Sequence, residues 1–237
     1  MKIGFIFPGQ GSQYVGMGKD LYEKYENVKK VYEEASEVLG IDVKEISFEG
    51  PEEILNQTKN TQIAILVMSL GILEVLKENG INAEISAGLS LGEYSALIYS
   101  GYISFEEGIK IVKKRGELMQ ENVPDGNWQM AGILGLDDST VEEICESIKT
   151  GFVVPANYNC PGQVVISGEG KAVEIAMEMA KECGARKAVL LKTSGPFHTK
   201  KLSASAEKLK TELDKIQINF NKEKKVIKNL DAKEYKE

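Results

Sequence analysis

One serine and one histidine carry the strongest chemical signal in this chain. Ser90 lies in Gly88-Leu89-Ser90-Leu91-Gly92, which matches the Gly-x-Ser-x-Gly pattern of a strand–turn–helix nucleophile elbow. His198 is the single histidine, so Ser–His chemistry within the chain must use it as the base. An imidazole activates a weakly nucleophilic hydroxyl by taking its proton during attack and later returning it. The pair predicts chemistry through a covalent serine intermediate.

Both residues also have structural interpretations. A glycine-rich turn at 88–92 would suit close packing alone, and a lone histidine is more often structural or exposed than catalytic. The context favours chemistry, because an apolar segment at 83–87 precedes the turn and a helical pattern at 91–100 follows it. His198 follows a Gly-Pro loop at an expected domain junction, where binding sites tend to form.

Arg115 is the third residue with a chemical implication. It lies in a helix expected over 104–122, which opens with a Ser-x-x-Glu capping box. Its spacing from Ile111, Val112 and Met119 places it on the apolar stripe of that helix. A guanidinium that faces inward requires an anion. Two sources stay open at this point, a buried carboxylate of the protein and a carboxylate on a ligand.

Two other glycine-containing segments do not complete a nucleotide-binding motif. Gly9–Gln13 follows the first strand, but Tyr14 stands where the dinucleotide pattern needs glycine. Gly18-Lys19-Asp20 lacks the Ser or Thr of a phosphate loop. The first segment can instead let Gln10 approach another site closely. No spacing of His, Cys or carboxylates is typical of a metal site, and we expect neither metal nor resident cofactor.

Composition indicates a globular protein and narrows its partners. The chain has 237 residues, 42% of them hydrophobic and 27% charged, which suffices for one large domain with a smaller insert. A net charge of −7 argues against nucleic acid as the main partner. Its three cysteines are widely spaced, which indicates free thiols in a reducing compartment. The longest apolar stretch, 63–73, is short for a bilayer, so we expect a core helix, no membrane anchor and a cytoplasmic location.

The order of expected elements predicts an α/β fold with an inserted domain. Apolar spacing and turn residues predict strands at 3–7, 83–87, 129–134, 152–156, 163–167, 188–192 and 226–230, and helices at 20–39, 61–77, 91–100, 104–122, 139–149, 172–183 and 199–216. Region 128–193 has the βαββαβ order of a ferredoxin-like domain. Residues 1–127 and 194–237 would form a large α/β catalytic domain with a hydrolase-like parallel-sheet core and the elbow.

Several segments taken together are far more specific than any one of them. They are Phe7–Gln13, Gly88–Tyr94, Arg115–Gln120, Asn157–Gly168 and Gly195–His198. In this order they resemble the malonyl-CoA:acyl carrier protein transacylases and the related acyltransferase domains of polyketide and fatty acid synthases. The resemblance covers essentially the whole chain. It implies malonyl transfer from malonyl-CoA to the phosphopantetheine thiol of acyl carrier protein, in fatty acid biosynthesis, without a cofactor. We expect a monomer.

The resemblance also implies a role for individual residues. Ser90 would attack the malonyl thioester and hold the acyl group as an ester. His198 would act as the general base and then as the acid. Gln10 and the backbone N–H of Leu91 would form the oxyanion hole, and Arg115 would bind the free malonyl carboxylate.

Acyl selectivity and two departures from the family pattern follow from the same comparison. Phe197 before the histidine and bulky Leu91 after the serine look like the malonyl-selective version, so Phe197 is an expected substrate contact. The family usually has histidine where this chain has Leu89. Family members also continue through further helices beyond the position of Glu237, so we expect this chain to lack that part.

Docking of the carrier protein should use local positive charge, because acyl carrier proteins are acidic. Lys200 and Lys201, just past His198, and Lys113-Lys114 are the expected contacts. The alternative is that they are ordinary solvated lysines.

Two other functions use the same residues differently. A serine hydrolase or thioesterase would share the Ser90–His198 pair, whereas a non-catalytic binding protein would form no covalent adduct. Arg115 helps to separate them, because a simple esterase has no need of an inward-facing cation.

Overall fold

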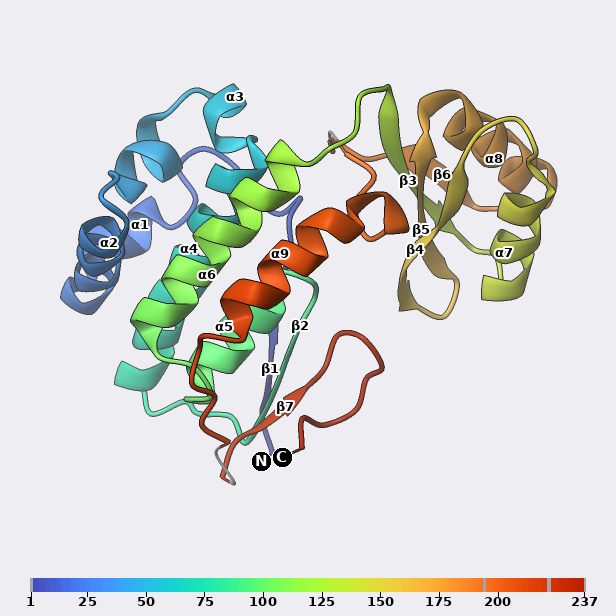
Figure 1. Cartoon of the computed structure of the whole chain (residues 1–237). Coiled ribbons are helices and arrows are strands. Elements are labelled where there is room, and N and C mark those ends of the chain that lie inside the picture. Colours follow the sequence, from blue (N-terminus) through green and yellow to red (C-terminus); the bar gives the residue numbers. More distant parts are fainter. Residues whose placement is uncertain (1, 194, 221–222, 237) are drawn as a thin grey trace. The chain divides into compact units, whose positions relative to one another are not determined.

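The computed structural model describes residues 2–193, 195–220 and 223–236 (Figure 1). The chain divides into two compact units, one comprising Met1–Leu118 and Lys208–Glu237 and the other Met119–Glu207. Ser194, at the expected domain boundary, and the terminal Glu237 lie outside the described residues.

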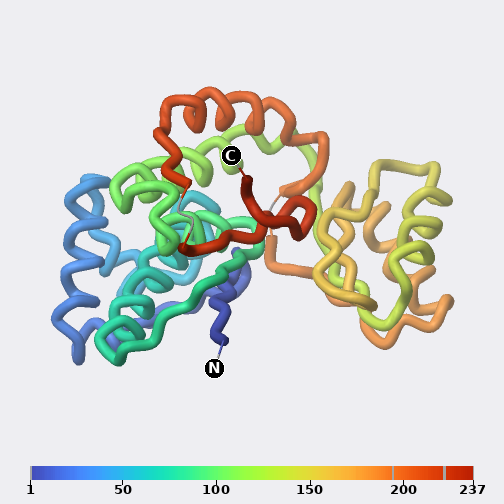
Figure 2. The backbone as a smooth tube through the Cα atoms, turned by 90° about the horizontal axis from the view of Figure 1, so that it is seen from below, coloured from blue at the N-terminus to red at the C-terminus, as the bar shows by residue number. Residues whose placement is uncertain are grey.

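A three-stranded parallel sheet organises the first unit. Its order is β1 (Gly4–Phe7), β2 (Ile85–Gly88) and β7 (Lys225–Ile227), with β2 in the centre. Phe7 is paired with Gly88, so β1 and β2 end side by side just before the glycine-rich segments that follow them. The chain returns to this sheet near its C-terminus, where β7 lies beside β2 (Figure 2). Loops at the carboxyl ends of parallel strands are the usual place for a site.

The other regular elements of the first unit are helices. The unit contains all or part of α1 (Lys19–Lys24), α2 (Glu26–Leu39), the short π-helical turn η1 (Glu45–Glu49), α3 (Glu52–Leu55), α4 (Thr58–Glu78), α5 (Gly92–Tyr99), α6 (Phe105–Glu121) and α9 (Ser203–Leu213).

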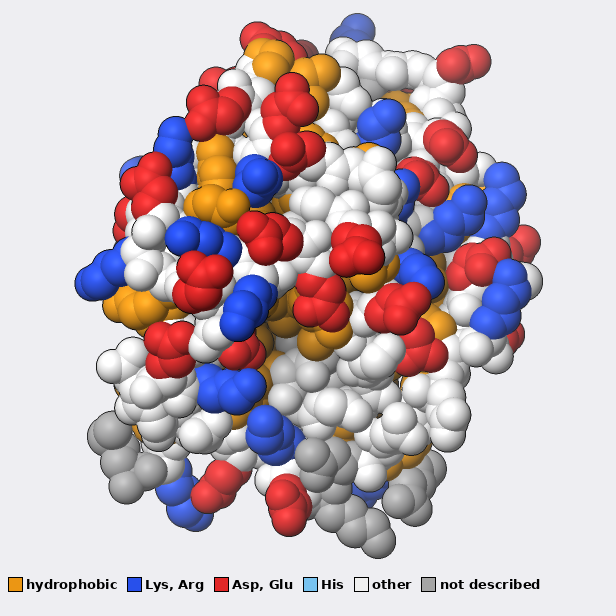
Figure 3. All heavy atoms as spheres, turned by 90° about the vertical axis from the view of Figure 1, so that its left-hand side faces the viewer, with side chains coloured by type: hydrophobic (Ala, Val, Ile, Leu, Met, Phe, Trp, Pro, Cys, Tyr) orange, Lys and Arg blue, Asp and Glu red, His pale blue; other side chains and the backbone are white. Residues whose placement is uncertain are grey.

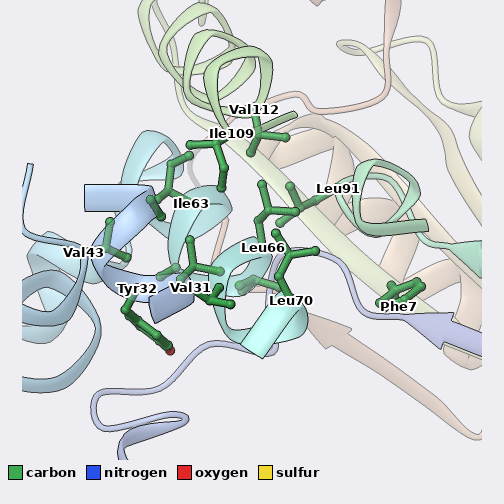
Figure 4. Close-up of a cluster of buried hydrophobic side chains, with 14 of the residues drawn as sticks. Phe7, Val31, Tyr32, Val43, Ile63, Leu66, Leu70, Leu91, Ile109 and Val112 are labelled. Atoms are coloured by element: carbon green, nitrogen blue, oxygen red, sulfur yellow. The ribbon is translucent and has the colours of Figure 1, made fainter. Parts of the chain in front are cut away.

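Helix α4 forms the centre of the core. Every residue from Ile63 to Val67 is buried, because the helix is apolar on most sides. Figure 4 shows Leu66 of α4 next to Leu91, and Ile63 near Ile109 of α6. By length and a mean hydropathy of 1.4, α4 would suffice to cross a membrane, but 56% of that window is buried inside the structure. A core helix of this kind was expected from the apolar run.

Local sequence signals explain where some helices begin and end. The capping box before α6 is confirmed: Ser104 Oγ donates to Glu107 Oε2 at 2.7 Å, and the Glu107 N–H donates back to Ser104 Oγ at 3.2 Å. The single helix expected over 20–39 is wrong, because Tyr25 is extended (φ −116°, ψ 121°) and separates α1 from α2. The break lets both helices turn apolar side chains toward one core.

The second unit contains a four-stranded antiparallel sheet with the order β4-β5-β3-β6. Its elements follow the expected βαββαβ order: β3 (Trp128–Leu134), α7 (Asp138–Ser147), β4 (Val153–Cys160), β5 (Gln163–Glu169), α8 (Gly170–Glu182) and β6 (Lys187–Leu190), followed by the single turn η2 (Lys200–Leu202). The two helices pack on the sheet around a core of small and branched side chains, including Ile133, Val164 and Ala176.

A small apolar cluster explains why this unit is wider than 128–193. Phe197 and Leu202 pack against Met130 of β3 and Val165 of β5, together with the partly buried Met119. Residues on both sides of the expected insert therefore share its packing.

Charge on the face in Figure 3 is mixed. Acidic and basic side chains alternate there among the described residues and do not gather by sign. This face therefore offers no continuous basic surface of the kind that nucleic acid requires.

Candidate active site

Ser90 lies on the expected strand–turn–helix junction. It follows β2 directly after Leu89, precedes α5, and has a positive backbone φ of 52°. A non-glycine residue with this φ is strained, and such residues concentrate at functional sites. The turn is closed by the Gly92 N–H, which donates to the carbonyl of Leu89 at 2.9 Å.

The two glycines of the motif permit this geometry. A Cβ on Gly92 would lie 2.3 Å from the carbonyl oxygen of Phe7, and a Cβ on Gly88 would lie 1.9 Å from the carbonyl carbon of Gly92. Both positions therefore exclude side chains for steric reasons. The two interpretations of this turn, close packing and a nucleophile elbow, are compatible. The tight approach of α5 to β1 and β2 is what presents Ser90.

Arg115 faces inward, as its place on the apolar stripe predicted, and lies beside the serine. It is 9% exposed. One guanidinium nitrogen donates to Ser90 Oγ at 2.8 Å, and the other donates to Gln62 Oε1 at 2.7 Å. The guanidinium carbon also lies 5.7 Å from the centre of the Tyr94 ring. Three helices, α4, α5 and α6, thus hold the cation in place.

This buried cation has no carboxylate partner in the described part of the chain. None of the ion pairs there includes Arg115, so the alternative of a structural ion pair is not supported. Burial lowers the pKa of the Arg115 guanidinium, while Tyr94 and Glu93 act in the opposite direction. An arginine stays protonated in proteins. The geometry therefore presents a positive charge next to Ser90 Oγ whose hydrogen-bond partners among the described residues are neutral.

Tyr94 contributes as a neutral aromatic wall. Burial raises the pKa of its hydroxyl, and the neighbouring Arg115 opposes that shift. The ring therefore remains uncharged at neutral pH and stacks with the guanidinium.

The expected oxyanion donors lie in the same unit as Ser90. The Leu91 N–H has no hydrogen-bond acceptor among the residues that the structure describes, while the Leu91 side chain is fully buried and anchors the turn. Gln10 follows β1, and its Nε2 approaches Thr58 Oγ1 at 3.5 Å. An unpartnered N–H beside the nucleophile suits an oxyanion hole.

Leu89, at the position where the resemblance leads us to expect histidine, is 42% exposed. Its backbone packs closely against the first glycine-rich segment, because a Cβ on Gly9 would lie 2.8 Å from the Leu89 carbonyl oxygen.

His198 and Phe197 belong to the second unit. His198 is exposed and has a positive φ of 59°, in a turn that Thr199 Oγ1 stabilises by donating to the carbonyl of Pro196 at 2.7 Å. Phe197, expected to contact substrate, is buried in the small cluster with Met130. Ser90 and His198 lie in different units, so their meeting stays a prediction.

Two residues with direct contacts to the site were missed by the sequence analysis. Gln62 is fully buried and contacts Arg115, and an amide next to the apolar run of a helix was the available signal. Asn229 accepts a hydrogen bond from the Ser90 N–H at 2.8 Å, for which the sequence carries no signal.

The buried cysteine is unsuited to act as a nucleophile. Cys145 is buried, and burial raises the pKa of its thiol to about 12, which keeps it protonated. Among the described residues, no cluster of three His, Cys, Asp or Glu side chains could hold a metal ion.

The sequence model of the acyl transferase domain family matches residues 4–234 of this chain. This chain belongs to the acyl transferase family. Among its members, the malonyl CoA-acyl carrier protein transacylase of Bacillus subtilis is 47% identical over 233 residues, which cover 98% of this chain and 73% of that protein.

Solved structures of acyl transferases agree in fold. The malonyl CoA-acyl carrier protein transacylase of Coxiella burnetii has a TM-score of 0.95 at 38% identity, covering all of this chain and 75% of that one. A malonyl-transacylase solved in complex with the type II PKS acyl-carrier protein AntF has a TM-score of 0.94 at 41% identity and likewise covers the whole chain, with 77% of that protein matched.

Proposed function

We propose that this acyl transferase moves a malonyl group from malonyl-CoA to the phosphopantetheine thiol of an acyl carrier protein, through an ester on Ser90. The observation that carries this proposal is the Arg115 guanidinium, buried 2.8 Å from Ser90 Oγ and without a carboxylate partner among the described residues. A malonyl group carries a free carboxylate near its thioester carbonyl. The names of the relatives, which are transacylases for malonyl-CoA, support the same substrate.

The first half-reaction forms the acyl enzyme. Ser90 Oγ attacks the thioester carbonyl carbon, and His198 takes the hydroxyl proton. The negative charge on the carbonyl oxygen is stabilised by the Leu91 N–H and Gln10. The carbon–sulfur bond then breaks, and His198 returns the proton to the departing CoA sulfur. Arg115, which contacts the attacking oxygen at 2.8 Å, turns its donors to the malonyl carboxylate.

The second half-reaction reverses these steps with a different thiol. The phosphopantetheine sulfur attacks the ester carbon, His198 accepts its proton, and the bond to Ser90 Oγ breaks as the oxygen recovers a proton. Phe197 is buried in the apolar cluster with Met130, and its restriction of the acyl group to an unsubstituted malonyl unit stays an expectation from the family resemblance. No resident cofactor takes part.

The proposal extends to the fold and the state of the protein. We assign the first unit to a hydrolase-like core, because its parallel sheet presents Ser90 on a strained turn. We also assign the second unit to the ferredoxin-like class, and the βαββαβ order and the sheet order β4-β5-β3-β6 support this assignment. The protein is expected to act as a monomer in the cytoplasm.

Mass spectrometry of the intact chain tests the reaction. Brief exposure to malonyl-CoA should add one malonyl group to the chain but none to Ser90→Ala, and the adduct should persist until holo acyl carrier protein is added. Loss of the adduct in buffer alone would indicate a thioesterase. A folded chain that never acquires the adduct would overturn the proposal and leave a binding protein.

A further inference from the structure

The backbone of the nucleophile turn is held by the C-terminal part of the chain. Asn229 Oδ1 accepts a hydrogen bond from the Ser90 N–H at 2.8 Å, across 139 positions of sequence. Both residues belong to the first unit. The contact acts on the one residue of the turn whose φ, at 52°, is strained.

Asn229 is presented by a short hairpin that we call the clamp loop, residues 225–235. Its two arms are joined by hydrogen bonds from the Tyr235 N–H to the Val226 carbonyl at 3.0 Å and from the Lys228 N–H to the Lys233 carbonyl at 2.8 Å. One arm contains β7, so the clamp loop is itself anchored in the sheet beside β2. Asn229 is therefore placed by the same sheet that ends at Ser90.

Glu93 links the clamp loop to the turn a second time. From the first turn of α5, its Oε1 accepts the Asn229 N–H at 2.8 Å and the Tyr235 hydroxyl at 3.0 Å. Burial, together with the Glu93 carboxylate, raises the pKa of Tyr235, so the hydroxyl remains a donor. The side chain of Asn229 thus holds the turn while its backbone is held by the helix that follows the turn.

The conformation of Ser90 determines two directions that acyl transfer uses. One is the direction of Oγ, and the other is that of the next N–H, on Leu91, which has no acceptor among the described residues. A strained φ persists only where the surroundings determine it strongly. An acceptor that fixes the Ser90 N–H supplies such a constraint on the peptide just before the nucleophile.

We infer that Asn229, oriented by Glu93, is a positioning residue for the nucleophile: it holds the Ser90 backbone so that Oγ and the Leu91 N–H keep their relation during acyl transfer. This inference rests on the proposed function for its kinetic consequence. The contact itself can be tested without turnover.

Amide hydrogen exchange tests the contact. In the full chain, Asn229→Ala should speed exchange of the Ser90 amide at least tenfold, because its acceptor is gone. Asn229→Asp keeps an oxygen in place and should retain most of the protection. Leu230→Ala is the matched control, since Leu230 is the next residue of the clamp loop and is 90% exposed. Unchanged Ser90 exchange in Asn229→Ala would overturn the inference, whatever the activity of the chain.

Single-turnover acylation by malonyl-CoA tests the consequence. Asn229→Ala should lower the limiting rate of Ser90 acylation about 10- to 100-fold, because small errors in orientation are costly, with little change in the apparent Kd for malonyl-CoA. Asn229→Asp should recover part of the rate, and Leu230→Ala should match the wild type. A general structural defect would instead lower the melting temperature and the fraction of chains that react, not the rate of those that do.

A double-mutant cycle tests the role of Glu93. Glu93→Ala should reproduce the rate loss of Asn229→Ala, and the two together should be no worse than either one, because they act through one contact. Additive losses would mean that Glu93 acts independently. If the wild-type chain forms no adduct, the proposed function is refuted, and the hydrogen-exchange result alone decides whether the contact exists. If wild type and Asn229→Ala are acylated at equal rates, only the positioning role is refuted.

Discussion

Arg115 shows how the contacts of a single buried residue can determine substrate specificity. Among the described residues, the buried guanidinium contacts an amide, a hydroxyl and an aromatic ring but pairs with no carboxylate, so it can still bind one anion. Its planar donors match a carboxylate in a bidentate way that a lysine ammonium does not. The residue is therefore suited to distinguish a malonyl group from an acetyl group.

Arg115→Ala should separate these two substrates. Losing one partner of a buried charge pair costs about 2–5 kcal/mol, so kcat/KM for malonyl-CoA should fall about 30- to 5,000-fold. The acetyl-CoA rate should change little or rise, because acetyl lacks the carboxylate. Steady-state kinetics with both thioesters measures the ratio. Equal losses for both would show that Arg115 is structural.

At the scale of elements, helix α4 does more than fill the core. Its one buried amide, Gln62, accepts from Arg115 at 2.7 Å and sets the orientation of the guanidinium on α6. The acceptor at this position is neutral, which leaves the positive charge of Arg115 available to the substrate. A carboxylate there would neutralise that charge.

Gln62→Glu and Gln62→Leu should therefore fail in different ways. The Glu variant should stay folded, pair with Arg115 and lose about tenfold or more in kcat/KM for malonyl-CoA. The Leu variant leaves a buried guanidinium donor unpaired and should lose about 1–3 kcal/mol of unfolding free energy. Ser69→Ala, also a buried polar residue of α4 but without a hydrogen-bond partner in the structure described, is the control and should not lose stability. Malonyl kinetics of Gln62→Glu equal to wild type would contradict this account.

Close packing at the junction of β1, β2 and α5 leads to a second prediction at this scale, which concerns stability. Gly92→Ala should lower the unfolding free energy by about 3 kcal/mol, since its Cβ would lie 2.3 Å from the backbone of Phe7, which cannot move aside as a side chain can. Thermal unfolding measures the loss. Gly132→Ala, whose Cβ would meet nothing closer than 3.8 Å, should be nearly neutral. Similar melting temperatures for the two variants would show that the junction tolerates a methyl group.

At the scale of the whole molecule, the residues that the proposed reaction uses are distributed over both units. Ser90, Arg115 and the expected oxyanion donors belong to the first, and His198 belongs to the second. The proposed reaction uses residues of both units. Lys200 and Lys201 follow His198 closely in the chain.

Lys200→Glu should weaken use of the carrier protein and leave acylation by malonyl-CoA unchanged. A charge at the rim of an interface steers an acidic partner, so the KM for acyl carrier protein should rise about 3- to 10-fold at low salt and less at high salt. Lys201 is a poorer probe, because its ammonium lies 4.9 Å from the centre of the Phe152 ring and its loss would also disturb packing. Lys171→Glu, on α8, is the control for total charge. A carrier KM that does not respond to Lys200→Glu would remove this residue from the docking surface.

Short-range features of this protein are determined by the sequence itself. The glycines at 88 and 92, the capping box at Ser104 and the apolar stripe through Arg115 are local patterns, and the structure confirms the turn, the cap and the inward guanidinium. Local patterns succeed here because sterics, capping and amphipathic spacing act within one or two turns of the chain.

Only the tertiary structure decided which groups meet. Gln62, Arg115 and Ser90 come from three different helices or turns, and Asn229 reaches Ser90 from 139 positions away. The extended residue at Tyr25 was equally invisible, because packing of both helices on one core overrides a continuous helical pattern. Such contacts depend on how elements pack against one another, and spacing along the chain carries no information about a partner on another element.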